Sequence, residues 1–187
     1  MFQIINNFLD KNEIKKLYDI LWSSDLYLTG IEYSNVDRMD RRWSMAKKVN
    51  NEDININFYN EILNKILFLP ALNNEYICNR IMINAYKYSD VLSIHDDGVI
   101  NGFNNITAII YGNDTWDANW GSETVFFDKI GSDAEIIKSV LPKPGRLVLF
   151  DAGIPHTGRV PSPVFPNYRY SLVYNLQLNI PKKTGLI

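Results

Sequence analysis

The chain has 187 residues, the length of one ordinary domain with a sizeable hydrophobic core. Its composition, 46% hydrophobic and 13% aromatic, excludes an intrinsically disordered protein. A formal net charge of -2 gives no global electrostatic attraction to nucleic acid or to an anionic membrane. With one cysteine and two histidines, the chain has no intrachain disulfide, cysteine-rich zinc site or iron–sulfur cluster.

Two helices are predicted in the N-terminal part. The first covers residues 10–23, with Asp10 as N-cap and Glu13 at capping-box spacing. The second covers residues 52–69, where apolar residues recur every four positions until Pro70 stops the helix. We find neither a signal-peptide pattern nor an apolar run long enough to span a membrane, so a soluble, cytoplasmic protein is expected.

Short runs rich in β-branched and aromatic residues follow the helices, with turn signals between them. Many short strands at this spacing favour an all-β sandwich or barrel over a parallel α/β sheet, with the helices covering one face. We expect a single domain, in which residues 1–75 form a helical support and residues 76–180 the β core. The predicted strands are residues 43–49, 76–88, 106–111, 123–127, 146–150 and 168–178.

Both histidines lie where they could bind a metal. On a strand predicted to start near Tyr88, the period-two alternation puts His95 and Asp97 on one face and Asp96 on the other. His156 would come from another strand. Two histidines and one carboxylate can occupy one face of an octahedral metal and leave three positions open, as in non-haem Fe(II) oxygenases. An HxD triplet also occurs by chance, so the spacing alone leaves ordinary structural histidines as the alternative.

A series of linked motifs decides between these readings. In chain order they are NAYKY at 84–88, HDD at 95–97, TAIIY at 107–111, WGSETVFF at 120–127, PGRLVLF at 144–150, PH at 155–156 and RYSL at 169–172. Together they closely resemble the 2-oxoglutarate and Fe(II)-dependent dioxygenases of the prolyl 4-hydroxylase-like group, over residues 77–178. The resemblance implies a double-stranded β-helix, or jelly-roll, core. Residues 1–75 match only in their helix content.

The resemblance implies Fe(II) as the metal, 2-oxoglutarate and O2 as co-substrates, and His95, Asp97 and His156 as iron ligands. Ascorbate is a candidate additional reductant. Related halogenases lack the carboxylate ligand, so the presence of Asp97 favours hydroxylation of an unactivated C–H bond. The alternative from a different class is a cupin-like metal-binding module without turnover, which would need no buried carboxylate anchor.

The same resemblance places Arg169 where the family keeps the basic residue that pairs with the distal carboxylate of 2-oxoglutarate. A guanidinium suits this role because it offers two parallel charge-assisted hydrogen bonds. Ser171 shares a face with Arg169 and could add a hydroxyl donor. Tyr86 resembles the family tyrosine that contacts this carboxylate, with Tyr88 on the same face as the fallback. Arg159 is the alternative anchor.

Other positions near these motifs have two interpretations. Thr107 and Tyr111 share a strand face and either line the pocket or belong to the core. Ser122 stands where the family usually has a second glycine, which leaves the local loop geometry open. Gly145 is interpreted as a turn residue.

The implied substrate is a peptidyl residue, most obviously proline, and the basic segment 38–48 could flank the entrance. A free amino acid or another small metabolite is the second candidate. Nucleic acid is not expected as a substrate because no basic patch interleaved with aromatic residues accompanies the motifs. No membrane partner is expected, and the sequence does not predict the oligomeric state.

Overall fold

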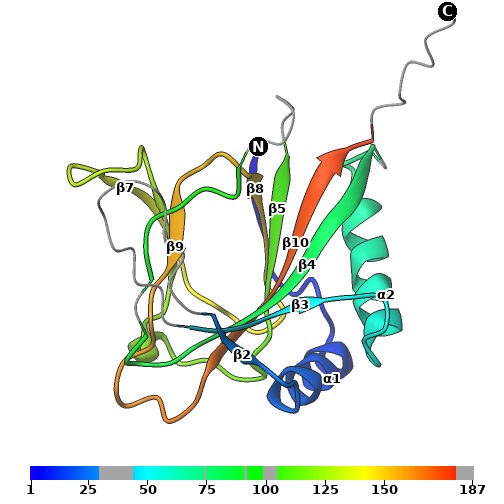
Figure 1. The fold of residues 1–187 in the computed structure, drawn as a ribbon, viewed down its shortest axis with the longest axis horizontal. Coiled ribbons are helices and arrows are strands. Elements are labelled where there is room, and N and C mark those ends of the chain that lie inside the picture. The colour runs from blue at the N-terminus through cyan, green and yellow to red at the C-terminus, as the bar shows by residue number, and fades with distance from the viewer. Residues whose placement is uncertain (30–43, 74, 91, 99–104, 180–187) are drawn as a thin grey trace, which may run out of the picture.

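The computed structural model describes residues 1–29, 44–73, 75–90, 92–98 and 105–179. Two α-helices and a series of strands account for most of this part of the chain (Figure 1). The helices are α1 (Lys11–Trp22) and α2 (Ile56–Leu67), and a short 3-10 turn covers Ala118–Trp120. The strands are β1 (Phe2–Ile5), β2 (Tyr27–Thr29), β3 (Ser44–Val49), β4 (Tyr76–Tyr86), β5 (Ile106–Tyr111), β6 (Thr124–Phe127), β7 (Ile136–Val140), β8 (Leu147–Asp151), β9 (His156–Gly158) and β10 (Arg169–Leu178).

The strands form two antiparallel sheets that face each other. The larger sheet has the order β1-β8-β5-β10-β4-β3-β2, and the smaller one the order β7-β6-β9. In Figure 1 the smaller sheet lies opposite the larger one, while both helices lie on the outer side of the larger sheet. The predicted fold class, a jelly-roll core with flanking helices, is confirmed.

Alternate residues of the large sheet enter two different cores. On β10, Leu172 and Tyr174 pack with helices α1 and α2 in the outer core, whereas Val173 packs between the two sheets. Strand β8 divides in the same way, with Leu149 in the outer core and Phe150 in the inner one. Because both faces are covered, these strands read as continuous apolar runs rather than as alternating ones.

Helix α1 begins as predicted. The Asp10 side chain accepts from the backbone N–H groups of Asn12 and Glu13, and the Glu13 carboxylate accepts from the backbone N–H of Asp10. This reciprocal capping box satisfies donors that a helix start leaves unpaired. Gly112 lies against this helix, where an added Cβ would meet a Leu21 methyl at 2.3 Å.

Helix α2 begins four residues later than the predicted start at residue 52. Its N-cap is Asn55, and Asp53 in the preceding turn accepts from the Asn55 backbone N–H. Asp53 also forms an ion pair with Lys47 of β3, at 2.6 Å. These contacts give the segment before α2 a turn conformation, since a short acidic side chain favours such local hydrogen bonds over helix.

The other predicted strands are found, with boundaries shifted by at most a few residues. Strand β4 ends at Tyr86, before its predicted end at residue 88. The stretch predicted as a strand from Tyr88 is wrong: Tyr88 lies in a turn, and residues 92–98 are extended with a single bridge at His95. Strands β1, β2 and β7 were not predicted. Of the basic segment 38–48, residues 38–43 lie outside the described residues. In the described part of the chain, no helix has the length and apolarity needed to cross a membrane.

Candidate metal and co-substrate site

Three side chains with metal-binding atoms meet between the two sheets. The candidate ligand atoms of His95, Asp97 and His156 lie within 4.8 Å of one another. Two reciprocal backbone hydrogen bonds hold the histidines opposite each other: His95 N donates to His156 O at 3.0 Å, and His156 N donates to His95 O at 2.7 Å. Asp97 N donates to Ala152 O at 2.9 Å. The expected side-by-side placement of His95 and Asp97 is therefore found, although this segment is not a regular strand.

Both imidazoles are oriented for coordination through the same ring nitrogen. His95 Nδ1 lies 3.0 Å from Ser93 O, and His156 Nδ1 lies 2.9 Å from Ile154 O. A carbonyl oxygen only accepts, so each Nδ1 carries a proton, and in the neutral ring this leaves the Nε2 lone pair for a metal. The donor set is thus two neutral imidazoles and one carboxylate, which fits Fe(II) with exchangeable positions left for other ligands.

The Asp97 carboxylate is held by residues of the large sheet. Thr107 donates its hydroxyl proton to Asp97 Oδ2 and accepts from the Asn175 amide at 3.2 Å. Arg80 Nη2 lies 3.9 Å from Asp97 Oδ1, and Arg80 Nε donates to Asn175 Oδ1 at 2.9 Å. Arg80 and Asn175 were missed in the sequence. Asn175 could have been found, because it shares the inward face of its strand with Arg169 and Ser171.

Arg169 is a buried cation at the other end of this inward face. It is 2% exposed, and its Nη atoms donate to Ser171 Oγ at 3.2 Å and Thr124 Oγ1 at 2.9 Å. Among the described residues, its Nε has no hydrogen-bond partner and no acidic group forms an ion pair with it. A buried guanidinium with only neutral acceptors is costly, so this position is prepared for an anion. Arg159, the alternative anchor, is exposed.

The aromatic side chains predicted near Arg169 divide in two groups. The rings of Tyr86 and Tyr111 have their centroids 5.2 and 5.0 Å from the guanidinium carbon. Burial raises the pKa of Tyr111, an effect that the neighbouring Arg169 charge opposes, and its hydroxyl donates to Thr124 at 2.8 Å. Tyr88 is 59% exposed and follows the end of β4, so its predicted placement on the face of Tyr86 is wrong. Thr124 was missed, although the WGSET stretch contains it.

The substitution of serine for the family glycine at position 122 keeps the glycine backbone conformation. Ser122 has φ of 64°, in the left-handed region. Its buried hydroxyl donates to Arg159 O at 2.7 Å, which compensates the cost of that conformation. Gly145, with φ of 63°, is a turn residue as predicted.

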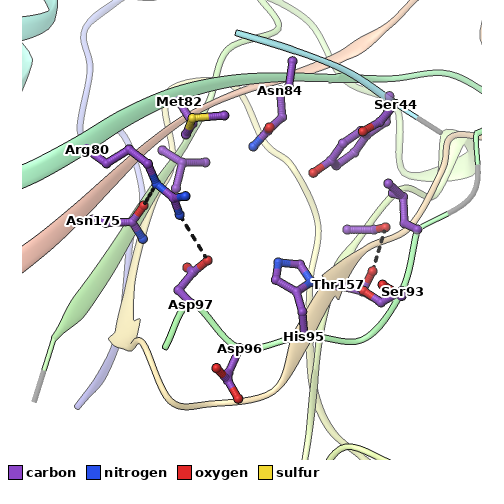
Figure 2. A pocket seen from close by; sticks show the side chains of 15 residues that line it. Ser44, Arg80, Met82, Asn84, Ser93, His95, Asp96, Asp97, Thr157 and Asn175 are labelled. Atoms are coloured by element: carbon purple, nitrogen blue, oxygen red, sulfur yellow. Dashed lines mark hydrogen bonds and ion pairs between the residues drawn. The ribbon is translucent and has the colours of Figure 1, made fainter. Parts of the chain in front are cut away.

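A cavity of about 410 Å³ opens over the candidate ligands (Figure 2). His95 and Asp97 lie on one side of it, and residues of β3, β4, β9 and β10 form the other walls. In Figure 2 the Asp96 side chain points away from the cavity centre. Phe150 and Phe126 pack against His156, with ring centroids 4.7 and 6.0 Å away, and close the site on the side of the inner core.

These features define a metal site of the two-histidine, one-carboxylate class inside a jelly roll. The sequence profile of the 2OG-Fe(II) oxygenase superfamily matches residues 81–177, and the chain belongs to this superfamily. It is therefore a 2-oxoglutarate-dependent dioxygenase that uses Fe(II), 2-oxoglutarate and O2. A search of curated proteins finds no match.

Solved structures with the same fold include several prolyl hydroxylases. One, from Trichoplax adhaerens in complex with a hypoxia inducible factor oxygen degradation domain peptide fragment, is 20% identical with a TM-score of 0.65, covering 95% of this chain and 82% of that chain. The Pseudomonas putida prolyl-4-hydroxylase is 16% identical with a TM-score of 0.65, covering 96% and 93%. The viral collagen prolyl hydroxylase of Paramecium Bursaria Chlorella virus-1, in a 2OG complex, is 13% identical with a TM-score of 0.59, covering 95% and 96%.

Proposed function

We propose that the protein hydroxylates an unactivated C–H bond, with Fe(II) held by His95, Asp97 and His156 and 2-oxoglutarate anchored on Arg169. The observation that carries the proposal is the pairing of two features across one barrel interior. One is a cluster of three metal-binding side chains, and the other is a buried guanidinium that has no acidic partner among the described residues. A metal-binding module without turnover has no use for the second feature.

The chain's own residues have separate tasks in this reaction. Thr107 fixes the orientation of the Asp97 carboxylate, and the backbone carbonyls at Ser93 and Ile154 fix the two imidazoles. Arg169 neutralises and orients the distal carboxylate, with Ser171 and Thr124 holding the guanidinium in place. Phe126 and Phe150 of the inner core cover His156 and exclude water from that side of the site.

Bound Fe(II) supplies the activation of O2 and couples oxidative decarboxylation of 2-oxoglutarate to the attack on the substrate. The overall change is balanced: 2-oxoglutarate, O2 and R–H give succinate, CO2 and R–OH. One oxygen atom enters succinate and the other enters the product. The protein positions the target carbon near the metal, where orientation contributes much of the rate.

For the substrate we propose a peptidyl residue, proline first. Support comes from the fold neighbour that was solved with a peptide fragment and from the motifs shared with the prolyl 4-hydroxylase-like group. Residues of β3 and β4 line the cavity beside the candidate ligands, so a bound substrate would lie against these two strands. A free amino acid or other small metabolite is the second candidate, and the size of the cavity, about 410 Å³, accommodates it.

The site assignment is tested by adding Fe(II) and 2-oxoglutarate to the apo protein without oxygen and measuring the visible metal-to-ligand charge-transfer band. Asp97→Ala should lose the band. Asp96→Ala is the matched control, because its exposed carboxylate points away from the cavity, and it should keep the band. Absence of the band in the wild-type protein at saturating ligand would refute the oxygenase site. Succinate release with blocked peptides and with free amino acids then separates the two substrate candidates.

A further inference from the structure

We propose that Arg80 binds a carboxylate of the substrate, which makes the preferred substrate an anionic one. This inference rests on the proposed function of the site, and it adds the chemistry by which the substrate is recognised. The side chain of Arg80 lies on the wall of the cavity formed by β4, beside the candidate metal ligand Asp97 (Figure 2).

A β-bulge turns Arg80 into the cavity. In the pairing of β4 with β10, Asn175 lies opposite Arg80 but Leu176 lies opposite Cys78, so Asn79 is an extra residue on β4. Before the bulge, Tyr76 and Cys78 pack toward the outer core; beyond it, Arg80, Met82 and Asn84 line the cavity. Without the extra residue, Arg80 would share the outward face with Cys78. Bulges of this kind commonly re-aim a side chain beside an active site.

The guanidinium of Arg80 is held at one end and available at the other. Its Nε donates to Asn175 Oδ1 at 2.9 Å, which fixes the plane of the group. Among the described acidic residues only Asp97 forms an ion pair with it, at 3.9 Å, beyond hydrogen-bond distance. Within the described residues, the Nη atoms therefore have no hydrogen-bond acceptor. The side chain is 43% exposed, so a ligand in the cavity can reach these donors.

The balance of charge in the loaded site also favours an anion. The Asp97 carboxylate and the two carboxylates of 2-oxoglutarate are balanced by the divalent metal and Arg169. Arg80 then adds a positive charge, while the other acid on the cavity wall, Asp96, directs its carboxylate outward. A substrate carboxylate would remove this imbalance with charge-assisted hydrogen bonds from the Nη atoms.

Asn84 gives the same wall a second polar contact. It faces the cavity from the position four residues beyond Arg80, with its amide directed inward in Figure 2. No described residue forms a hydrogen bond with this amide. A substrate that presents a carboxylate to Arg80 and a polar group to Asn84 would satisfy both side chains.

A carboxylate can come from a free amino acid or from an acidic residue next to the hydroxylated one in a peptide. The test uses two sets of compounds with matched neutral partners. The first contains the common free L-amino acids and their carboxamides. The second contains end-blocked peptides with proline next to aspartate or glutamate, and the same peptides with asparagine or glutamine. Binding is measured as a shift of the anaerobic charge-transfer band, and turnover as succinate release.

The proposal predicts that the compounds with a free carboxylate shift the charge-transfer band and give succinate release. Their neutral partners should give a far smaller band shift and far less succinate. In Arg80→Ala the KM of the accepted compound should rise by about tenfold or more, because a charge-assisted contact is lost. Arg80→Lys should recover part of the loss. Lys143→Gln, which removes an exposed positive charge without a described side-chain partner, should behave as wild type. The Kd for 2-oxoglutarate should stay unchanged in all three variants.

Several results would overturn the assignment. These are an equal response to the neutral partners, an unchanged KM in Arg80→Ala, or no response to either set by a protein that forms the band. If Arg80→Ala raised the Kd for 2-oxoglutarate by the same factor as the KM of the substrate, Arg80 would act only through Asp97. A wild-type protein that forms no band refutes the proposed function instead, so the two failures are distinct.

Discussion

Replacing Arg169 with methionine should weaken 2-oxoglutarate binding without destabilising the unliganded protein. Methionine keeps most of the side-chain volume but removes the charge. In the unliganded protein Arg169 is 2% exposed; within the part of the chain that the structure describes, its Nε is unpartnered and its Nη atoms reach only neutral hydroxyls. Because such a buried charge is poorly compensated, its removal should leave the free energy of unfolding unchanged or raise it.

The effect on the co-substrate should be large. Removing one partner of a buried ion pair costs about 3–5 kcal/mol, since the other charge is then left uncompensated. This corresponds to a rise in the 2-oxoglutarate Kd of about 100-fold or more. The Kd can be measured by anaerobic calorimetry on Mn(II)-loaded protein. Thermal melts should show that 2-oxoglutarate stabilises the wild type and no longer stabilises Arg169→Met at the same concentration.

The matched control is Arg159→Met, which removes the same charge from an exposed position. It should leave both the Kd and the thermal shift as in the wild type. Equal effects of the two substitutions would refute the assignment of Arg169. A strong loss of stability in unliganded Arg169→Met would also contradict the reasoning, because it would mean that the guanidinium is well compensated without a ligand.

Three further predictions concern the surroundings of the site and the stability of the fold. Thr107→Val should raise the Kd for Co(II) by about tenfold, because the hydrogen bond that holds the Asp97 carboxylate is lost; an unchanged Kd in a metal titration would contradict this. For Asp53, burial alone would raise the pKa, but the hydrogen bonds from Lys47 and the Asn55 backbone lower it below 3.8. The ionised Asp53 carboxylate therefore stabilises the fold at a pH above its unfolded-state pKa. This contribution is lost as the pH falls through the lower folded-state pKa. Urea unfolding between about pH 6 and about pH 3 should therefore show a steeper loss of stability in the wild type than in Lys47→Met, and parallel curves would refute the coupling. Burial raises the pKa of Cys78 to about 11, so its thiol should react slowly with iodoacetamide at neutral pH and faster as the pH approaches that value. Rapid reaction at neutral pH would show that the pKa of this thiol is not raised.

The sequence located the metal cluster even though it misjudged the local structure. His95 and Asp97 were assigned to one face of a strand, yet residues 92–98 form an extended segment joined to the small sheet by one bridge. The result was the same because an extended backbone also alternates its side chains. The two histidines of the chain left little choice of ligands, so the identity of the cluster did not depend on the strand assignment.

Short edge strands and the start of α2 could not be predicted in the same way. Strand β7 has exposed isoleucines on its surface, and β2 has three residues, so neither carries the pattern of a half-buried strand. They exist because neighbouring strands pair with them, β6 with β7 and β3 with β2. The segment before α2 continues the helical pattern, but the tertiary ion pair between Asp53 and Lys47 favours a turn there.

By itself the sequence determined the candidate metal ligands, the capping of the first helix, the main strands and the basic residue at position 169. The first three follow from residue types and from local periodicity, whereas the role of position 169 is implied by the resemblance of the linked motifs to the prolyl 4-hydroxylase-like group. Only the tertiary structure decided that Arg169 is buried without an acidic partner among the described residues, that Tyr88 is turned out to solvent and that Arg80 faces the cavity. The last of these depends on one extra residue in β4, which reverses the faces of the strand. A bulge is set by pairing with β10, a strand ninety or so residues away in the chain, so the periodicity of β4 alone does not reveal it.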